Sequence, residues 1–366
     1  MRLVIIGTTI HGEGGYLPFD RLAAESNFSD VTFVIAGDRN SAPFDTSKFL
    51  CRVEYLEPVD QERFSVSETI GWKTPRRRPI AWLRAIELGP DYILSIDDDN
   101  IPSPDYFRRW HDVLTKPVGR VAVPAAASGP APWHNYLRTS DAPFEIYPRG
   151  FPIPFRPASA IEIRAADAPI PPERVGLFQG ISLGDPDIDG MTRLVYPKRL
   201  PLNAISEKNY CLRDVWSPYN MQNTAFAKIL FPLPILWPHA AQFDDIYASF
   251  VWQKVLFNNG RHAHVGDPVN RQDRGVRDIL NTDFRETVEG YFYAHRVWEV
   301  INGIAEKDPI AFMKKLMEYG DDPRDGSELT FSRHLWSFPT GERHIIGRHR
   351  DFFTAHLKDV TAALGG

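Results

Sequence analysis

The strongest constraint on the fold is a series of short apolar runs that alternate with helical segments over residues 1–125. We predict strands over residues 2–7, 30–40, 52–58, 91–96 and 119–126, and helices over residues 16–26, 79–89 and 103–115. Strands that alternate with helices are typical of an α/β fold with a mostly parallel, doubly wound central sheet flanked by helices. Ligands bind such sheets beyond the carboxyl ends of the strands. We therefore expect the loops after Gly7, after Gly37 and at Asp97–Asp99 to open on one edge.

The chain changes character after this alternating part. Residues 127–220 are rich in proline, which lacks an N–H and restricts the residue before it, so we predict loops there. Helical patterns return over residues 243–260, 284–303 and 308–320. We predict an α/β domain over residues 1–275 and a helical C-terminal appendage over residues 276–366 that packs on it.

Composition excludes several classes of protein. The formal net charge of -5 gives no general attraction to nucleic acid or to an anionic membrane. No run approaches the roughly 20 apolar residues that a membrane span needs. Cys51 and Cys211 are too few for a disulfide framework, which fits a reducing compartment. We expect a cytoplasmic protein with no nucleic-acid partner and no membrane span. The sequence does not decide whether the protein forms a homo-oligomer.

Three consecutive aspartates, Asp97–Asp99, follow the apolar strand "YILSI". Crowded carboxylates repel unless a cation lies between them, and Mg²⁺ and Mn²⁺ prefer such oxygen ligands. Two alternatives remain open at this point. The aspartates can cap the helix that begins near Ser103, or be solvated, because charge runs usually lie on the surface. A phosphatase that uses an Asp-x-Asp nucleophile is a further alternative, although it expects its aspartates after the first strand.

Other charged residues are candidates with a structural alternative for each. The basic stretch 73–79 is either a phosphate contact before a helix or a solvated turn. Asp244 and Asp245 either cap a helix or approach a sugar hydroxyl. His262 and His264 can reach a metal, although two nearby histidines are more often structural.

Five segments in order resemble one family. They are "YILSIDDDN", "PRGFPIPFRP", "GLFQGISLGDPDIDGMTRL", "YNMQNTAFA" and "FDDIYASFVWQKVL". The set resembles the reversibly glycosylated polypeptides, or UDP-arabinopyranose mutases, over roughly residues 1–295. "VIAGDRN" is closer to bacterial and STELLO-type relatives. The sequence departs from the family at Asn100, where the family usually has Cys, and at Gln272, where it tends to have His.

The resemblance implies a GT-A-like fold and a set of roles. UDP would bind near Thr8, Thr9 and Asp38, with Asp98 toward the ribose and Arg76 and Arg78 toward phosphate. Asp97 and Asp99 would hold Mn²⁺ or Mg²⁺ on the diphosphate, and either His264 would substitute for the missing histidine or the metal would rely on Asp99 alone. Arg156 would hold or capture the sugar, and the candidate bases are Asp187, Asp189, Asp244 and Asp245.

These roles imply a metal-dependent enzyme that acts on a UDP-sugar, with a mutase-like interconversion of pyranose and furanose rings and self-glycosylation at Arg156. A first alternative is a glycosyltransferase that passes the sugar from a nucleotide-sugar donor to a separate acceptor. A second alternative is a non-catalytic subunit that binds nucleotide-sugar.

Overall fold

The computed structural model describes residues 1–125, 132–156, 161–195, 201–273, 280, 284–320 and 345–365. The strands are β1 (Arg2–Thr8), β2 (Asp30–Ala36), β3 (Arg52–Leu56), β4 (Tyr92–Ile96), β5 (Asn100–Pro102), β6 (Val118–Pro124), β7 (Ile161–Ile170), β8 (Val175–Gly184), β9 (Tyr210–Leu212), β10 (Asn223–Ala227) and β11 (His262–Gln272). The helices are α1 (Leu17–Ala24), α2 (Pro58–Gln61), α3 (Val66–Ile70), α4 (Arg78–Glu87), α5 (Tyr106–Thr115), α6 (Gly190–Val195), α7 (Asp244–Asn258), α8 (Arg285–Gly303), α9 (Pro309–Tyr319), α10 (Ile345–Arg348) and α11 (Arg350–Gly365).

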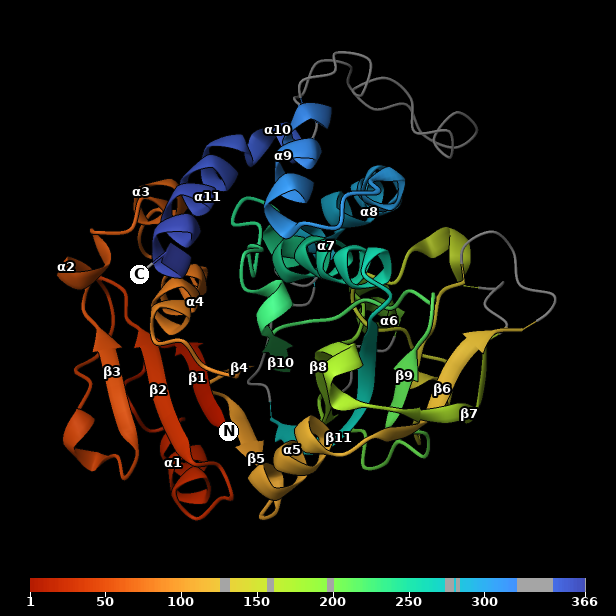
Figure 1. Cartoon of the computed structure of the whole chain (residues 1–366), viewed down its shortest axis with the longest axis horizontal. Coiled ribbons are helices and arrows are strands. Elements are labelled where there is room, and N and C mark those ends of the chain that lie inside the picture. The colour runs from red at the N-terminus through yellow and green to blue at the C-terminus, as the bar shows by residue number, and fades with distance from the viewer. Residues whose placement is uncertain are drawn as a thin grey trace.

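All these strands belong to one sheet in the order β3-β2-β1-β4-β10-β8-β11-β9-β6-β7, and β5 pairs with β11 (Figure 1). The first four strands of this order are parallel throughout. Strands β7, β8 and β11 share their direction, whereas β5, β6, β9 and β10 run the opposite way. Most strands therefore point one way, and the predicted α/β fold with a mostly parallel central sheet flanked by helices is confirmed.

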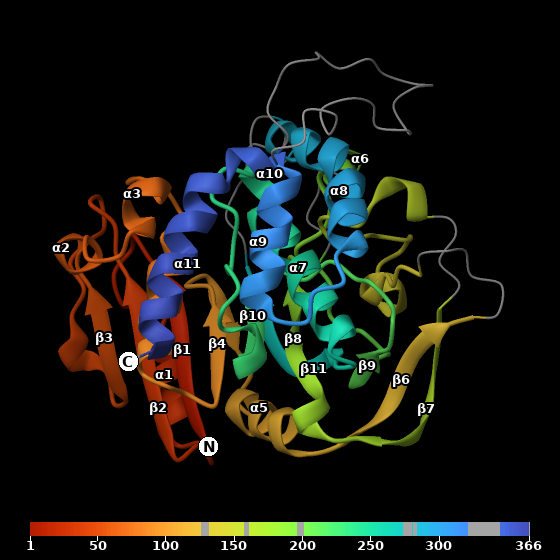
Figure 2. The same cartoon turned by 45° about the horizontal axis from the view of Figure 1, so that its top comes forward.

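The sheet is buried on both faces because successive side chains of a strand point to opposite sides. In β1, Val4 and Ile6 join the core beneath α4, α7 and the C-terminal helices. Leu3 and Ile5 join a second core beneath α1 and α5. Figures 1 and 2 show the same division, with α8, α9 and α11 in the upper part of the molecule and α1 and α5 in the lower part. Apolar runs without alternation, as in "RLVIIG", are the expected sequence of such strands.

The middle of the chain is more regular than the sequence predicted. Between residues 127 and 220 we expected loops, but the described residues there form β7, β8, β9 and the short helix α6. Strand β8 lies in the sheet between β10 and β11. Its three glycines, within "VGLFQGISLG", weaken the strand signal. Packing explains the glycine at position 176, because a Cβ atom there would lie 2.2 Å from the side chain of Leu256.

The C-terminal helices pack into the large core. Val297 of α8, Phe312 of α9 and Phe353 of α11 are buried in the same apolar cluster as Trp82 of α4. A long-range hydrogen bond also joins α11 to α3, where the Val66 N–H donates to the Asp359 carboxylate at 2.9 Å. Within the part of the chain that the structure describes, every helix is too short or too polar to cross a membrane.

Candidate functional site

A cavity of about 370 Å³ opens at the carboxyl ends of β1, β2 and β4. It is lined by Thr8, Thr9, Ile10, His11, Ala36, Asp38, Asn40, Lys73, Thr74, Pro75, Arg77, Arg78, Asp97, Asp98 and Asp99. The structure thus brings together the three loops that the strand order predicted to share one edge. We call this space the strand-end cavity.

Each of the three aspartates has a different neighbour. The Asp97 carboxylate accepts a hydrogen bond from Arg78 at 2.5 Å, and the Asp98 carboxylate accepts one from the Thr9 hydroxyl at 2.6 Å. The Asp99 carboxylate accepts from the side-chain amide of Gln272 at 3.1 and 3.2 Å. All three carboxylates line the strand-end cavity, together with Asp38 and the basic side chains of Lys73, Arg77 and Arg78.

Asp38 shapes the wall of the cavity. Its two carboxylate oxygens accept hydrogen bonds from the backbone N–H groups of Lys73 and Thr74, each at 2.9 Å, and one oxygen also accepts from the Arg39 N–H. Lys73 has a φ of 59°, a left-handed conformation that is unfavourable for a lysine without such support. Asp38 therefore holds the loop that precedes α4 while it also lines the strand-end cavity.

The basic stretch before α4 makes mostly internal contacts. Arg78 is 7% exposed and donates to Ser95 and to the Met221 carbonyl as well as to Asp97. Arg77 is buried, where it donates to nearby side chains and carbonyls and stacks on a tryptophan. Burial lowers the pKa of Arg77 to about 10.

Arg76 lies outside the lining of the strand-end cavity. Its Nε atom donates to the Asp244 carboxylate at 3.1 Å, which ties the loop before α4 to the first turn of α7. Among the predicted phosphate contacts, Arg78 reaches the cavity wall and Arg76 makes this cross-link instead.

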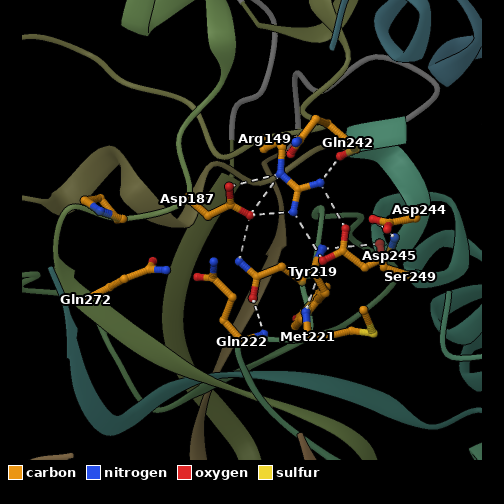
Figure 3. Close-up of polar contacts among 12 residues, drawn as sticks. Arg149, Asp187, Tyr219, Met221, Gln222, Gln242, Asp244, Asp245, Ser249 and Gln272 are labelled. Atoms are coloured by element: carbon orange, nitrogen blue, oxygen red, sulfur yellow. Dashed lines mark hydrogen bonds and ion pairs between the residues drawn. The ribbon is translucent and has the colours of Figure 1, made fainter. Parts of the chain in front are cut away.

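A second group of charges is buried behind the strand ends (Figure 3). Arg149 makes a two-pronged ion pair with Asp187, with its shortest contact at 2.8 Å, and a second pair with Asp245 at 3.0 and 3.2 Å. Asn220 donates to Asp187, and the Met221 N–H donates to Asp245. Burial, together with the nearby charges of other aspartates and against the effect of Arg149, raises the pKa of Asp245 to about 6. We call this group the interior cluster.

The sequence prediction included Asp187 and Asp245 but missed their shared partner, Arg149. The only signal for it is the run "YPRGFP", in which Arg149 precedes Gly150. Gly150 has a φ of 86°, and a Cβ atom there would lie 2.3 Å from the side chain of Ile246. The turn that carries Arg149 therefore requires glycine and packs directly on α7.

Arg156 and Asp189 lie elsewhere. The guanidinium of Arg156 lies 3.5 Å from the Asp189 carboxylate and 4.7 Å from the ring centre of Tyr147. Arg156 lines a separate cavity of about 450 Å³, none of whose lining residues also lines the strand-end cavity. The Asp189 carboxylate accepts hydrogen bonds from the backbone N–H groups of Met191 and Thr192, so it holds the first turn of α6.

The prediction for His264 requires a correction. His264 is buried in the sheet opposite Phe178 and Cys211, and burial lowers its pKa to about 3. It lines a third cavity, together with Arg109. The β11 residue beside Asp99 is Gln272, which lies eight residues further along the strand, or roughly 25 Å at the usual rise per residue. His264 therefore cannot join the aspartates at a metal.

The loop Asp97–Asp99 can supply a metal ion with only part of its ligands. Within the described ranges, no group of three or more His, Cys, Asp or Glu side chains is arranged to hold a metal ion. Asp97 and Asp99 supply hard oxygen donors on the cavity wall. Such a pair suits a cation that takes one or two carboxylates from the protein and its other ligands from phosphate and water.

Comparisons with known proteins show similarity of structure at low sequence identity. No protein-family model matches the sequence, and no curated protein matches it significantly. A crystal structure of glucosyl-3-phosphoglycerate synthase from Mycobacterium tuberculosis with Mn²⁺, UDP-glucose and phosphoglyceric acid is 11% identical, with 95% of this chain and 91% of that chain covered and a TM-score of 0.39. Residues 1–349 of TarS from S. aureus with UDP-GlcNAc are 10% identical, with 99% and 91% covered and a TM-score of 0.37.

Proposed function

We propose that this protein is a metal-dependent glycosyltransferase that transfers a sugar from a UDP-sugar to a separate acceptor. The observation that supports it best is the arrangement of Asp97–Asp99, which line one cavity with the loops after β1 and β2. The carboxylates of this cavity suit a bound cation, and Lys73 and the buried Arg78 suit a diphosphate. A metal ion and a diphosphate can therefore bind there together.

Asp97 and Asp99 would hold Mn²⁺ or Mg²⁺. When bound, the metal neutralises charge on the departing nucleoside diphosphate. Arg78 fixes the Asp97 carboxylate, and Gln272 fixes that of Asp99. The nucleoside would lie against Thr8 and Thr9, in the same cavity.

Transfer requires a base for the acceptor hydroxyl. We assign this role to Asp244, because 18% of its side chain is exposed and it begins α7 beside the interior cluster. The acceptor O–H gives its proton to the carboxylate, a bond forms between that oxygen and the anomeric carbon, and the bond from this carbon to the diphosphate oxygen breaks. The electron pair of that bond leaves with UDP. Arg76 would orient Asp244 through its 3.1 Å contact.

The mutase alternative depends on Arg156 next to the sugar. Because Arg156 and the aspartates line different cavities, the geometry favours transfer to a separate acceptor. A mutase would release UDP-sugar with a contracted ring in the absence of any acceptor. A transferase would leave the sugar ring unchanged.

The first experiment measures thermal stability of the protein with UDP, GDP, CDP and dTDP, each with Mn²⁺, Mg²⁺ or a chelator. Ligands that bind the folded state raise the melting temperature by mass action. We expect the largest rise with UDP and metal, no rise with chelator, and loss of the effect in Asp99→Asn. A rise with another nucleotide but not with UDP would overturn the donor assignment.

The second experiment separates the chemistries by product analysis with radiolabelled UDP-sugar. Label that moves to an added sugar acceptor supports the transferase. Ring-contracted UDP-sugar without acceptor supports the mutase, and binding without turnover of any sugar supports a non-catalytic subunit.

A further inference from the structure

We infer that Asn100, Gln222 and Gln272 form a subsite that selects a neutral, hydroxyl-rich donor sugar. We call these three residues the carboxamide subsite. The inference rests on the proposed function, because it places the sugar of the donor next to Asp99, and it adds the class of sugar that the site accepts.

Contacts between these residues place them together at the end of the sheet. Gln272, the last residue of β11, pairs with Asn100, the first residue of β5. The side-chain amide of Asn100 donates to the backbone carbonyl of Gln222 at 2.8 Å. Figure 3 shows the side chains of Gln222 and Gln272 directed toward the same space, beside Asp187. Because Gln272 also contacts Asp99, this space adjoins the strand-end cavity.

The chemistry of these contacts fixes which end of each amide faces the space. A carboxylate and a backbone carbonyl can only accept hydrogen bonds, so the NH₂ groups of Gln272 and Asn100 must face Asp99 and the Gln222 carbonyl. The carbonyl oxygens of both side chains therefore point away from those partners. This orientation follows from donor and acceptor chemistry and does not depend on how an amide is assigned.

Three buried acceptors are left without a hydrogen bond. The side-chain carbonyl oxygens of Asn100, Gln222 and Gln272 are buried and have no hydrogen-bond partner within the described residues. The three residues are 3%, 7% and 1% exposed. Buried polar atoms are normally paired, and unpaired ones need an explanation such as a ligand. Three such atoms on residues that contact one another indicate a ligand that donates several hydrogen bonds.

Sugar hydroxyl groups fit this requirement, since each can donate to a carbonyl oxygen. The surroundings are rich in acceptors, with the carboxylates of Asp99 and Asp187 on two sides and Arg149 already committed to the interior cluster. A sugar acid would bring a further negative charge here, and a deoxy sugar would leave an acceptor unpaired. The subsite therefore favours neutral sugars with their hydroxyls intact. A cation shared by Asp99 and Gln272 is disfavoured, because the amide NH₂ faces that carboxylate.

Calorimetric binding with Mn²⁺ tests the inference on the wild-type protein, with UDP, UDP-glucose, UDP-galactose, their deoxy analogues and UDP-glucuronic acid. We expect at least one neutral UDP-sugar to bind about tenfold or more tightly than UDP, because one good hydrogen bond is worth up to about tenfold. UDP-glucuronic acid and the deoxy analogue that lacks the contacted hydroxyl should lose this gain. Equal affinity for UDP and for every UDP-sugar, or tightest binding of UDP-glucuronic acid, would overturn the inference.

Variants sharpen the same measurement. Gln222→Met and Gln272→Met keep the side-chain volume, and each should lower the ratio of UDP-sugar affinity to UDP affinity by about tenfold. UDP itself should bind to Gln222→Met as before, whereas Gln272→Met also removes the donor that fixes the Asp99 carboxylate. Gln179→Met is the matched control, because Gln179 is also a buried amide with an unpaired carbonyl but lies in the middle of β8. Its ratio should stay unchanged.

The two proposals fail in different ways. An unchanged ratio in both subsite variants, with UDP still bound in the presence of metal, contradicts the carboxamide subsite and leaves the glycosyltransferase intact. Absence of metal-dependent UDP binding in the wild-type protein contradicts both. The deoxy analogues give the same decision on the wild-type protein if a variant does not fold.

Discussion

The molecule contains two groups of aspartates in different surroundings, one on the wall of a cavity and one around a buried arginine. Asp97–Asp99 lie on a cavity wall, where they contact Arg78, Thr9 and Gln272 respectively. In the interior cluster, Asp187 and Asp245 share Arg149, and the side chains of all three are at most 11% exposed. The first group faces a cavity that a ligand can enter. The second is paired within the protein.

This difference separates binding from positioning. Carboxylates that a cavity exposes can be neutralised by a cation from solution. Buried carboxylates must be paired by the chain itself, because removal from water is costly for an unpaired charge. We therefore propose ligand binding for the open group, Asp97–Asp99, which face a cavity, and support of neighbouring residues for Asp187 and Asp245, which share Arg149 inside the protein.

The largest expected effect is on the interior cluster. Arg149→Met leaves two buried carboxylates without their partner, so we expect a loss of about 3–5 kcal/mol in the free energy of unfolding. Urea unfolding measures it. Arg149→Lys keeps the charge without the two-pronged geometry and should lose less. A change below about 1 kcal/mol in the methionine variant would show that the cluster is not buried as described.

The open group should respond in activity instead of stability. Asp99→Asn should lower kcat/KM by about 100-fold or more, because charge stabilisation at the reacting group is lost. Its free energy of unfolding without ligand should change by no more than about 0.5 kcal/mol. Asp112→Asn, which removes an exposed carboxylate of α5, is the matched control. A destabilised Asp99→Asn protein would mean that the two groups do not differ as proposed.

A smaller effect is expected where α11 supports the open group. Asp359→Ala removes the acceptor for the Val66 N–H at the start of α3, which precedes the loop that carries Arg77 and Arg78. We expect a loss of about 1–2 kcal/mol in unfolding free energy and weaker UDP binding. Lys358→Ala, next to it on the exposed side of α11, should change neither. Equal losses in both variants would exclude a specific role for this hydrogen bond.

The smallest effect is the pH dependence that Asp245 contributes. Its pKa is raised to about 6 by burial, whereas an unfolded aspartate titrates near 3.9. The folded protein therefore binds this proton more tightly, so the contribution of Asp245 to stability rises as pH falls from about 7 to about 4. Urea unfolding at several pH values should show a weaker rise in Asp245→Asn than in wild type. Identical slopes in both proteins would contradict the raised pKa.

The part of the molecule that the sequence predicts well is the part made of neighbouring elements. In residues 1–125 each strand and its helix follow one another, so hydrophobic period and loop position suffice to place Thr9, Asp38 and Asp97–Asp99 on one edge. The central strands do not follow this rule. Strand β8 lies between β10 and β11, and three glycines interrupt the apolar residues that mark it as a strand.

The partners of the site were harder to predict for the same reason. Arg149 and Asp245 are 96 residues apart in sequence, and Gln272 and Asp99 are 173 apart. No local pattern carries such a pairing. The resemblance suggests His264 as a substitute for a histidine that this sequence lacks, but the register of β11 decides which of its residues reaches the aspartates.

The hydrogen bond between Val66 and Asp359 also has a consequence for how the chain is made. The two residues are separated by 293 positions. At about 5–20 residues per second, roughly 15–60 s of synthesis pass between them on the ribosome. Until then α3 lacks this acceptor at its first turn. The start of α3 is therefore completed only when nearly the whole chain has been made.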